Sequence, residues 1–218
     1  MTSRRYDAVL FDLLTALLDS WTLWTDVAGS PEVGRRWRDE YLRRTYAAGD
    51  YRPYEQLVAE ASSAQGLDSS FHHELTHRWG ELSAWPEVPG VLRELSEAGV
   101  RLGVVTNCSE TLGRSAAAKL GDALEIVVTS EAAGAYKPRP EPYDLALSRL
   151  ELPAERVLFV AGSKFDLPGA ASVGMPVWWH NRVRMDRGDL PAPVAEHHTL
   201  TPLLQDVLAR DGGIPSKP

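Results

Sequence analysis

The chain has 218 residues, of which 44% are hydrophobic and 24% are charged, a composition that suits one globular domain or a domain with a small insert. Its 30 acidic residues outnumber its 23 basic ones and give a formal net charge of −7, which argues against a nucleic-acid partner. Cys108 is the single cysteine, so no disulfide can form within the chain, and no apolar run approaches the ~20 residues that a membrane span needs. We therefore expect a cytoplasmic protein that does not bind a membrane.

Five apolar segments predict buried β-strands, because each is a continuous run rather than an alternation of apolar and polar residues. They cover residues 8–11, 102–105, 126–129, 157–160 and 177–179. Between them, helical patterns occur at 89–98, 112–120 and 143–150. Strands that alternate with helices indicate a doubly wound α/β fold, in which helices cover both faces of a parallel sheet.

Residues 20–84 break this alternation, because they contain no convincing strand. Helical patterns occur at 34–46, 54–64 and 71–82. Helix-breaking residues separate them at 49–50, 53 and 66–69. We expect a small helical cap of residues 20–84, inserted after the first strand, above an α/β core of residues 1–19 and 85–210. A cap in this place would exclude water and supply specificity. Residues 211–218 are rich in Gly and Pro and are expected to form a flexible tail.

Polar residues follow four of the predicted strands. The first is Asp12, with Thr15 three residues later. A carboxylate here can act as a nucleophile, or it can cap the helix or turn that follows. Thr106 and Asn107 come after the second strand. Together with the N–H groups of the next helix they could bind a carboxylate or a phosphate, or they could cap that helix.

Two further charged residues follow the third and fourth strands. Lys137 precedes a proline in an extended loop. Beside Asp12 its ammonium group would keep that carboxylate ionised and neutralise an anionic substrate, although such a lysine is also common on protein surfaces. Asp166 precedes a glycine-bearing helix start, where it could orient a water as a base, ligate a metal ion or cap the helix. In an open parallel sheet, residues beyond the carboxyl ends of the strands line the ligand crevice.

The order of these four segments resembles the haloacid dehalogenase superfamily, whose four motifs follow one another in this order on a doubly wound, Rossmann-like sheet. The resemblance covers nearly the whole chain. It implies an enzyme, a hydrolase that uses Asp12 as a nucleophile and passes through a covalent aspartyl intermediate. It also implies a small-molecule anionic substrate.

The finer resemblance is to the 2-haloacid dehalogenase branch of the superfamily. Phosphatases of the superfamily carry a second aspartate where this chain has Leu14, and they use it to protonate the leaving group. A halide ion leaves without a proton. Phosphatases also carry a further aspartate ahead of the last one, whereas Asp166 is the only acid between Val160 and that position. The resemblance therefore implies that no cofactor is needed; if Mg²⁺ were used, Asp12 and Asp166 would be its ligands.

The resemblance also assigns roles to individual residues. It implies that Asp12, Lys137 and Asp166 are catalytic. It implies that Arg38, on the predicted cap, binds the departing halide. The substrate-binding set that it implies consists of Thr15, Arg38, Thr106, Asn107, Tyr143 and Ser163. Similar dehalogenases often form homodimers through cap helices, so a homodimer is expected here too.

Three hypotheses about function stay open at this point. The first is hydrolysis of the carbon–halide bond of a small carboxylic acid by a 2-haloacid dehalogenase-like enzyme. The second is a Mg²⁺-dependent phosphatase that acts on a small phosphate ester. The third is a catalytically weak binding protein with the same fold. The second stays open because most members of the superfamily are magnesium-dependent phosphatases. The third stays open because motif positions are altered: Ala161 and Ser163 replace a serine and an asparagine of the dehalogenases.

Overall fold

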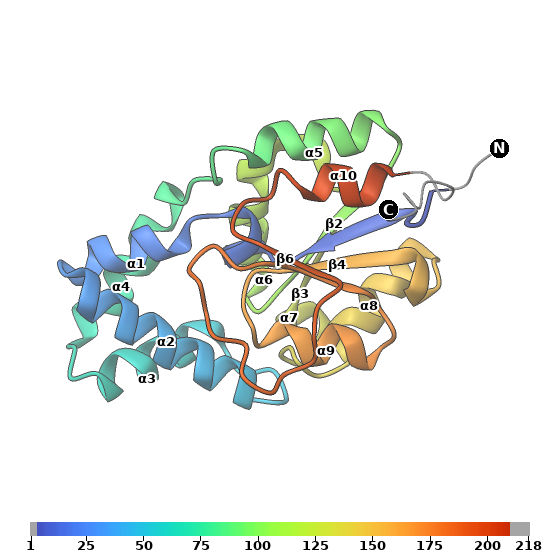
Figure 1. Cartoon of the computed structure of the whole chain (residues 1–218). Helices are drawn as coiled ribbons and strands as arrows, with labels where there is room; N and C mark the ends of the chain where they lie inside the picture. The colour runs from blue at the N-terminus through green and yellow to red at the C-terminus, as the bar shows by residue number, and fades with distance from the viewer. Residues whose placement is uncertain (1–3, 210–218) are drawn as a thin grey trace.

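A computed structural model describes residues 4–209 of the chain. Its centre is a six-stranded sheet in the order β3-β2-β1-β4-β5-β6, and every neighbouring pair of strands is parallel (Figure 1). The strands are β1 (Ala8–Phe11), β2 (Arg101–Thr106), β3 (Ile126–Thr129), β4 (Val157–Ala161), β5 (Val177–His180) and β6 (Ala195–His197). The predicted α/β class is confirmed. The predicted tail, 211–218, lies outside the described residues.

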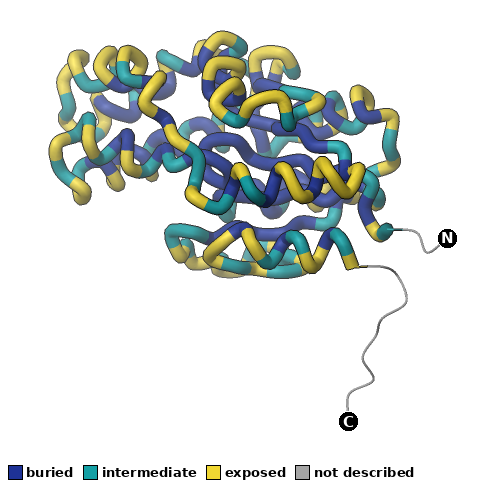
Figure 2. Tube along the Cα trace, turned by 90° about the horizontal axis from the view of Figure 1, so that it is seen from above, coloured by how far each residue is buried: buried dark blue, intermediate teal, exposed yellow. Residues whose placement is uncertain are grey.

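Helices cover both faces of the sheet, and Figure 2 shows the buried strands between helices whose outer sides are exposed. Side chains alternate along each strand, so Val9 and Phe11 join one core cluster while Ala8 and Leu10 join the other. The first cluster includes residues of α5 (Val88–Glu97), α6 (Glu110–Ala117) and α10 (Leu203–Leu208). The second includes residues of α8 (Glu141–Leu150) and α9 (Asp166–Ser172).

A group of helices follows β1 and lies beside the sheet in Figure 1. We call them the inserted helices: α1 (Ser20–Ala28), α2 (Pro31–Ala47), α3 (Tyr54–Ala64), α4 (Ser69–His77) and the 3-10 helix η2 (Arg78–Glu81). The predicted division into a cap of residues 20–84 and a core stays a proposal. No helix in the described part of the chain combines the length and apolar character required to cross a membrane.

Two short backbone junctions connect the inserted helices to the rest of the molecule. At the first junction, where the chain leaves and returns, Leu18 pairs with Ala84 in an antiparallel bridge. At the second junction, Asp50 pairs with Ala135 in the same way. There the amide of Tyr51 donates to the carbonyl of Gly134 at 2.9 Å, and the amide of Tyr136 donates to the carbonyl of Gly49 at 2.8 Å. Because the second junction ends next to Lys137, it links α2 and α3 to the loop that carries this lysine.

Candidate active site

The carboxyl ends of β1 and β4 bring together the charged residues that the sequence singled out. Asp12 follows β1 directly, and Asp166 begins α9 just after β4. Lys137 lies in the loop between α7 (Ser130–Ala133) and α8. Its Nζ is 2.8 Å from Oδ1 of Asp12 and 2.8 Å from Oδ1 of Asp166. All three side chains are buried. We call this group the carboxylate–lysine cluster.

Asp12 is held in place by the turn that follows it. It caps a short π-helix, η1 (Leu13–Leu17), and its Oδ2 accepts hydrogen bonds from the Thr15 amide at 2.8 Å and the Thr15 hydroxyl at 2.6 Å. Asp12 therefore caps η1 through Oδ2 alone, and its Oδ1 is left to contact Lys137. Burial acts to raise the pKa of Asp12, but the Lys137 ammonium and the Thr15 hydrogen bonds outweigh it and hold the pKa below its ordinary value. Asp12 is thus kept as a carboxylate.

The pKa of Asp166 is shifted in the opposite direction to that of Asp12. Burial raises its pKa, and although Lys137 and a hydrogen bond from Tyr46 act to lower it, the pKa stays above its ordinary value. Burial lowers the pKa of Lys137, but the two carboxylates prevail and raise it. The cluster therefore holds a charged lysine between one firmly ionised carboxylate and one that accepts a proton more readily.

A small cavity opens in front of Asp12. Its lining consists of Asp12, Leu14, Thr15, Arg38, Tyr41, Leu42, Thr45, Tyr46, Thr106 and Asn107. The space in it that water-sized spheres can occupy is about 10 Å³, which is room for about one water molecule. Five of these residues belong to the inserted helix α2, which therefore forms one wall of the cavity.

Arg38 is the cation of this cavity. It is 1% exposed, and its Nη2 donates to the Ser20 hydroxyl at 2.7 Å. Its guanidinium group lies 5.0 Å from the ring centre of Trp24 and 5.2 Å from that of Tyr41. Within residues 4–209, the Nε and Nη1 atoms of Arg38 have no hydrogen-bond acceptor, and the nearby Asp39 interacts with Arg38 through its charge but forms no ion pair with it. Buried guanidinium N–H groups without acceptors are costly, so this place is suited to an anion.

Thr106 offers one further free donor to the cavity. Its hydroxyl is buried and has no hydrogen-bond partner among the described residues. The neighbouring Asn107 also lines the cavity, but its side chain is engaged elsewhere. Its Oδ1 accepts from the Lys137 amide at 2.8 Å and from the Ser130 hydroxyl at 2.8 Å, and its Nδ2 donates to the Lys137 carbonyl at 3.1 Å. The Asn107 side chain thus holds the lysine loop in position.

Two predicted substrate-binding residues do not line the cavity. Ser163 is buried, and its hydroxyl accepts from the Phe165 amide at 3.3 Å. Tyr143 is buried in the second core cluster, with its ring centre 5.2 Å from that of Phe159. Its hydroxyl has no hydrogen-bond partner within the described residues. The substrate-binding roles of both residues stay predictions.

Tyr46 is a residue of the site that the sequence did not point out. It lies on α2, lines the cavity and donates from its hydroxyl to Oδ1 of Asp166 at 2.6 Å. One signal was available, because Arg38, Leu42 and Tyr46 are four residues apart and share one face of a helix. With Arg38 assigned to the site, the same face of the helix would have indicated Tyr46 as well.

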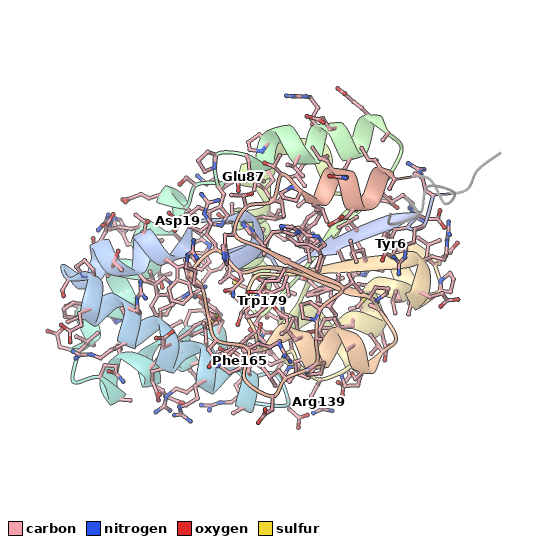
Figure 3. All side chains as sticks on the ribbon, in the orientation of Figure 1. Tyr6, Asp19, Glu87, Arg139, Phe165 and Trp179 are labelled. Atoms are coloured by element: carbon pink, nitrogen blue, oxygen red, sulfur yellow. The ribbon has the colours of Figure 1, made fainter. Side chains whose placement is uncertain are left out.

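An open groove of about 330 Å³ lies outside the cavity, and Trp21, Arg35, Lys164 and Phe165 are among its lining residues. The Phe165 ring stacks on Tyr46 at 5.2 Å, and Figure 3 places Phe165 where the inserted helices meet the rest of the chain. Phe165 and Tyr46 thus form part of the partition between the groove and the cavity.

Lys137 occupies one oxygen of each carboxylate that a magnesium ion would use. Oδ1 of Asp12 and Oδ1 of Asp166 both contact its ammonium group. A divalent ion there would lie beside a buried positive charge. Within residues 4–209, no three His, Cys, Asp or Glu side chains are grouped as metal ligands.

The fold and the carboxylate–lysine cluster define a class of α/β hydrolase that carries a buried carboxylate nucleophile. A family model described as haloacid dehalogenase-like hydrolase matches residues 6–174. The chain therefore belongs to the haloacid dehalogenase-like hydrolases, and the resemblance seen in its motifs is confirmed.

Individual relatives agree with this assignment. The chain is 30% identical over 200 residues to (S)-2-haloacid dehalogenase 1 of Pseudomonas sp. (strain CBS-3), covering 84% of this chain and 86% of that protein. It is 27% identical over 196 residues to haloacetate dehalogenase H-2 of Moraxella sp. (strain B), covering 82% and 87%. The crystal structure of the L-2-haloacid dehalogenase RSc1362 superposes with a TM-score of 0.81 at 29% identity, covering 94% of this chain and 99% of that one.

Proposed function

We propose that the protein hydrolyses the carbon–halogen bond of a small 2-haloacid and forms a covalent ester on Asp12 during the reaction. The observation that carries this proposal is the buried guanidinium group of Arg38, which has two nitrogen atoms without an acceptor and shares a small cavity with an ionised carboxylate. A nucleophile and an anion site in one cavity suit a reaction in which an anion leaves.

In the first step, the Asp12 carboxylate attacks the carbon that bears the halogen. A carbon–oxygen bond forms, the carbon–halogen bond breaks, and the halide departs toward Arg38. The substrate carboxylate is held by the Thr106 hydroxyl. Lys137 keeps Asp12 ionised until the attack. No proton is needed at the halide, which agrees with Leu14 in the cavity wall, where a phosphatase would need an acid.

In the second step, a water molecule hydrolyses the ester. The water attacks the Asp12 carbonyl carbon and gives a proton to Asp166. The bond between that carbon and the alkyl oxygen then breaks, and Asp166 returns the proton to the leaving alkoxide. The products are a 2-hydroxy acid and Asp12, which releases the second proton of the water because its pKa is low. Asp166 suits this role, since its raised pKa favours uptake of a proton.

The size of the cavity favours the smallest haloacids. The cavity has room for about one water molecule. Even a haloacetate is larger than that, so the lining must give way to admit a substrate. Each added carbon would increase that displacement. We expect chloroacetate and 2-chloropropionate to be better substrates than longer 2-haloacids.

The test is halide release from purified protein with chloroacetate and (S)-2-chloropropionate, in the presence and absence of EDTA. The proposal predicts halide release that EDTA does not change. Absence of halide release from both acids would overturn it. Hydrolysis of a phosphate ester that requires Mg²⁺ and stops in EDTA would support the phosphatase hypothesis instead.

A cytoplasmic location and a homodimer through the inserted helices stay predictions. The dimer has a direct test, because sedimentation or light scattering measures the mass of the particle against the 24.0 kDa of one chain.

A further inference from the structure

The carboxylate–lysine cluster contains one oxygen atom that accepts no hydrogen bond from the described residues. Both oxygens of Asp12 are engaged, one with Lys137 and the other with Thr15. Oδ1 of Asp166 accepts from Lys137 and from Tyr46. Oδ2 of Asp166 is buried and has no hydrogen-bond partner among the described residues. A buried carboxylate oxygen without a donor is unfavourable, and in an active site it is a natural place for a reacting water.

Tyr46 contributes to this arrangement from the other side of the site. Its hydroxyl reaches from α2 to a residue 120 positions away in sequence and donates at 2.6 Å. Its ring is fixed by stacking on Phe165, the neighbour of Asp166, at 5.2 Å and an interplanar angle of 28°. Burial, with the charges of Asp166 and Asp12, raises the pKa of Tyr46 well above its ordinary value, so it stays a hydrogen-bond donor.

With two donors on Oδ1, the Asp166 carboxylate has a fixed rotation. Lys137 alone could follow the carboxylate as it turns, because a lysine side chain is long and its three hydrogens are equivalent. The hydroxyl of Tyr46, on a rigid ring, is the second donor to Oδ1. Together the two donors fix the direction in which the Asp166 carboxylate points. Oδ2 is thereby left as the one oxygen of the cluster that can accept a proton from water.

We propose that Tyr46 is a positioning residue for the hydrolysis of the Asp12 ester: its hydroxyl holds Oδ1 of Asp166 so that Oδ2 accepts the proton of the attacking water. This inference rests on the proposed function and assigns Tyr46 to one of its two steps. The first step, attack by Asp12 and departure of the halide, does not involve Asp166 as a base. The second step does.

The test is the variant Tyr46→Phe, which keeps the ring and its stacking but removes the hydroxyl. Removing a hydrogen bond to a charged group slows the step in which that group acts by about 10- to 100-fold. We expect kcat to fall by about that factor while kcat/KM stays within about twofold, because kcat/KM reports steps up to the irreversible loss of halide. KM therefore falls together with kcat.

A second measurement shows the intermediate itself. After mixing with chloroacetate and quenching in acid, Tyr46→Phe should show one burst of halide per active site, and intact-protein mass spectrometry should show the added carboxymethyl ester on Asp12. Slower hydrolysis makes this ester accumulate more than in the wild type.

The matched control is Ser62→Ala. Ser62 also carries a buried hydroxyl on the inserted helices, but it donates at 2.8 Å to the Ala59 carbonyl within its own helix and does not contact the carboxylates. We expect kcat of this control to stay near the wild-type value. If the wild type releases no halide, the proposed function fails. If the wild type releases halide but Tyr46→Phe keeps its kcat and accumulates no ester, or loses kcat/KM in proportion to kcat, the inference about Tyr46 fails and the proposed function stands.

Discussion

At the scale of single residues, Asp12 owes its negative charge to its partners rather than to its position. The same carboxylate that caps η1 is also bound to a buried ammonium group, and the two contacts together keep it ionised. If the ester forms on this carboxylate, an amide in its place cannot attack the carbon. Asp12→Asn should lower halide release at least roughly a thousandfold.

Halide release and an intact mass that shows no deamidation back to aspartate are the measurements for Asp12→Asn. The control is Asp19→Asn, since Asp19 also caps a helix, accepting from the Thr22 amide at 3.1 Å, but lies outside the cavity. Near-normal turnover by authentic Asp12→Asn would show that another group is the nucleophile.

Lys137 sets the charge of Asp12, so its removal should change how activity depends on pH. In Lys137→Met the main lowering influence on the pKa of Asp12 is lost and the effect of burial, which raises it, remains. Asp12 is then protonated to a higher pH than in the wild type. We expect kcat/KM to fall at neutral pH and to recover as the pH rises.

The pH profile of halide release measures this shift. Lys164→Met is the control, because Lys164 Nζ donates to the Asp186 carbonyl at 2.9 Å and not to a carboxylate of the cluster. An acid limb at the same pH in Lys137→Met and the wild type would contradict the role given to Lys137.

Residue types were easier to predict than residue contacts. Asp12, Lys137 and Asp166 were found because each follows a strand whose apolar run is unmistakable. Asn107 was also found, but its side chain holds the lysine loop, and nothing in its neighbours along the chain indicates that. Tyr46 was missed because its contact with Asp166 depends on how α2 packs against the sheet. Its spacing from Arg38 indicates only the face of the helix on which it lies.

At the scale of elements, the turn after β1 is possible because glycine directly follows the neighbouring strand β4. A Cβ on Gly162, the residue after β4, would lie 2.2 Å from the Ala16 amide nitrogen and 2.3 Å from the Thr15 hydroxyl. These atoms are backbone or held by hydrogen bonds, so η1 would have to move. Gly162→Ala should cost about 1–3 kcal/mol of unfolding free energy and reduce halide release, because Thr15 would leave Asp12.

Urea unfolding and halide release test this prediction together. Gly90→Ala in α5 is the matched control, since a Cβ there meets nothing within 4 Å and alanine favours helix. We expect the control to be at least as stable as the wild type. Equal stability and activity in the two variants would show that the close approach at Gly162 is not a constraint.

The elements themselves were predicted with uneven success. Strands at 8–11 and 126–129 match the structure at both ends, because uninterrupted apolar runs mark buried strands. The strand β6 was missed, since its Ala-Glu-His sequence is half exposed and pairs only at the edge of the sheet. The predicted helix at 71–82 is wrong at both ends. It starts at Ser69, becomes a 3-10 turn after His77 and ends at Glu81.

At the scale of the whole molecule, the second junction connects the inserted helices to the lysine loop. Besides its two backbone hydrogen bonds it carries an ion pair between Arg139, labelled in Figure 3, and Asp50. Exposed pairs of this kind contribute little. We expect Arg139→Ala to speed hydrogen exchange at the Tyr51 and Tyr136 amides by about two- to fivefold.

Hydrogen exchange followed by mass spectrometry or NMR measures the exchange rates of the Tyr51 and Tyr136 amides. Arg36→Ala is the control, because the pair of Arg36 with Glu32 lies on the exposed side of α2, and it should leave both amides unchanged. Unaltered exchange in Arg139→Ala would mean that the backbone hydrogen bonds alone hold the junction.

The second junction also bears on the geometry around Asp12. It holds Gly134 and Tyr136 by backbone hydrogen bonds, and these residues lead directly into Lys137, whose ammonium group contacts Asp12. A displacement of the inserted helices would therefore be passed on to the contact between the lysine and the carboxylate. The seating of the helices over the sheet and the setting of this charge pair are thus one mechanical unit.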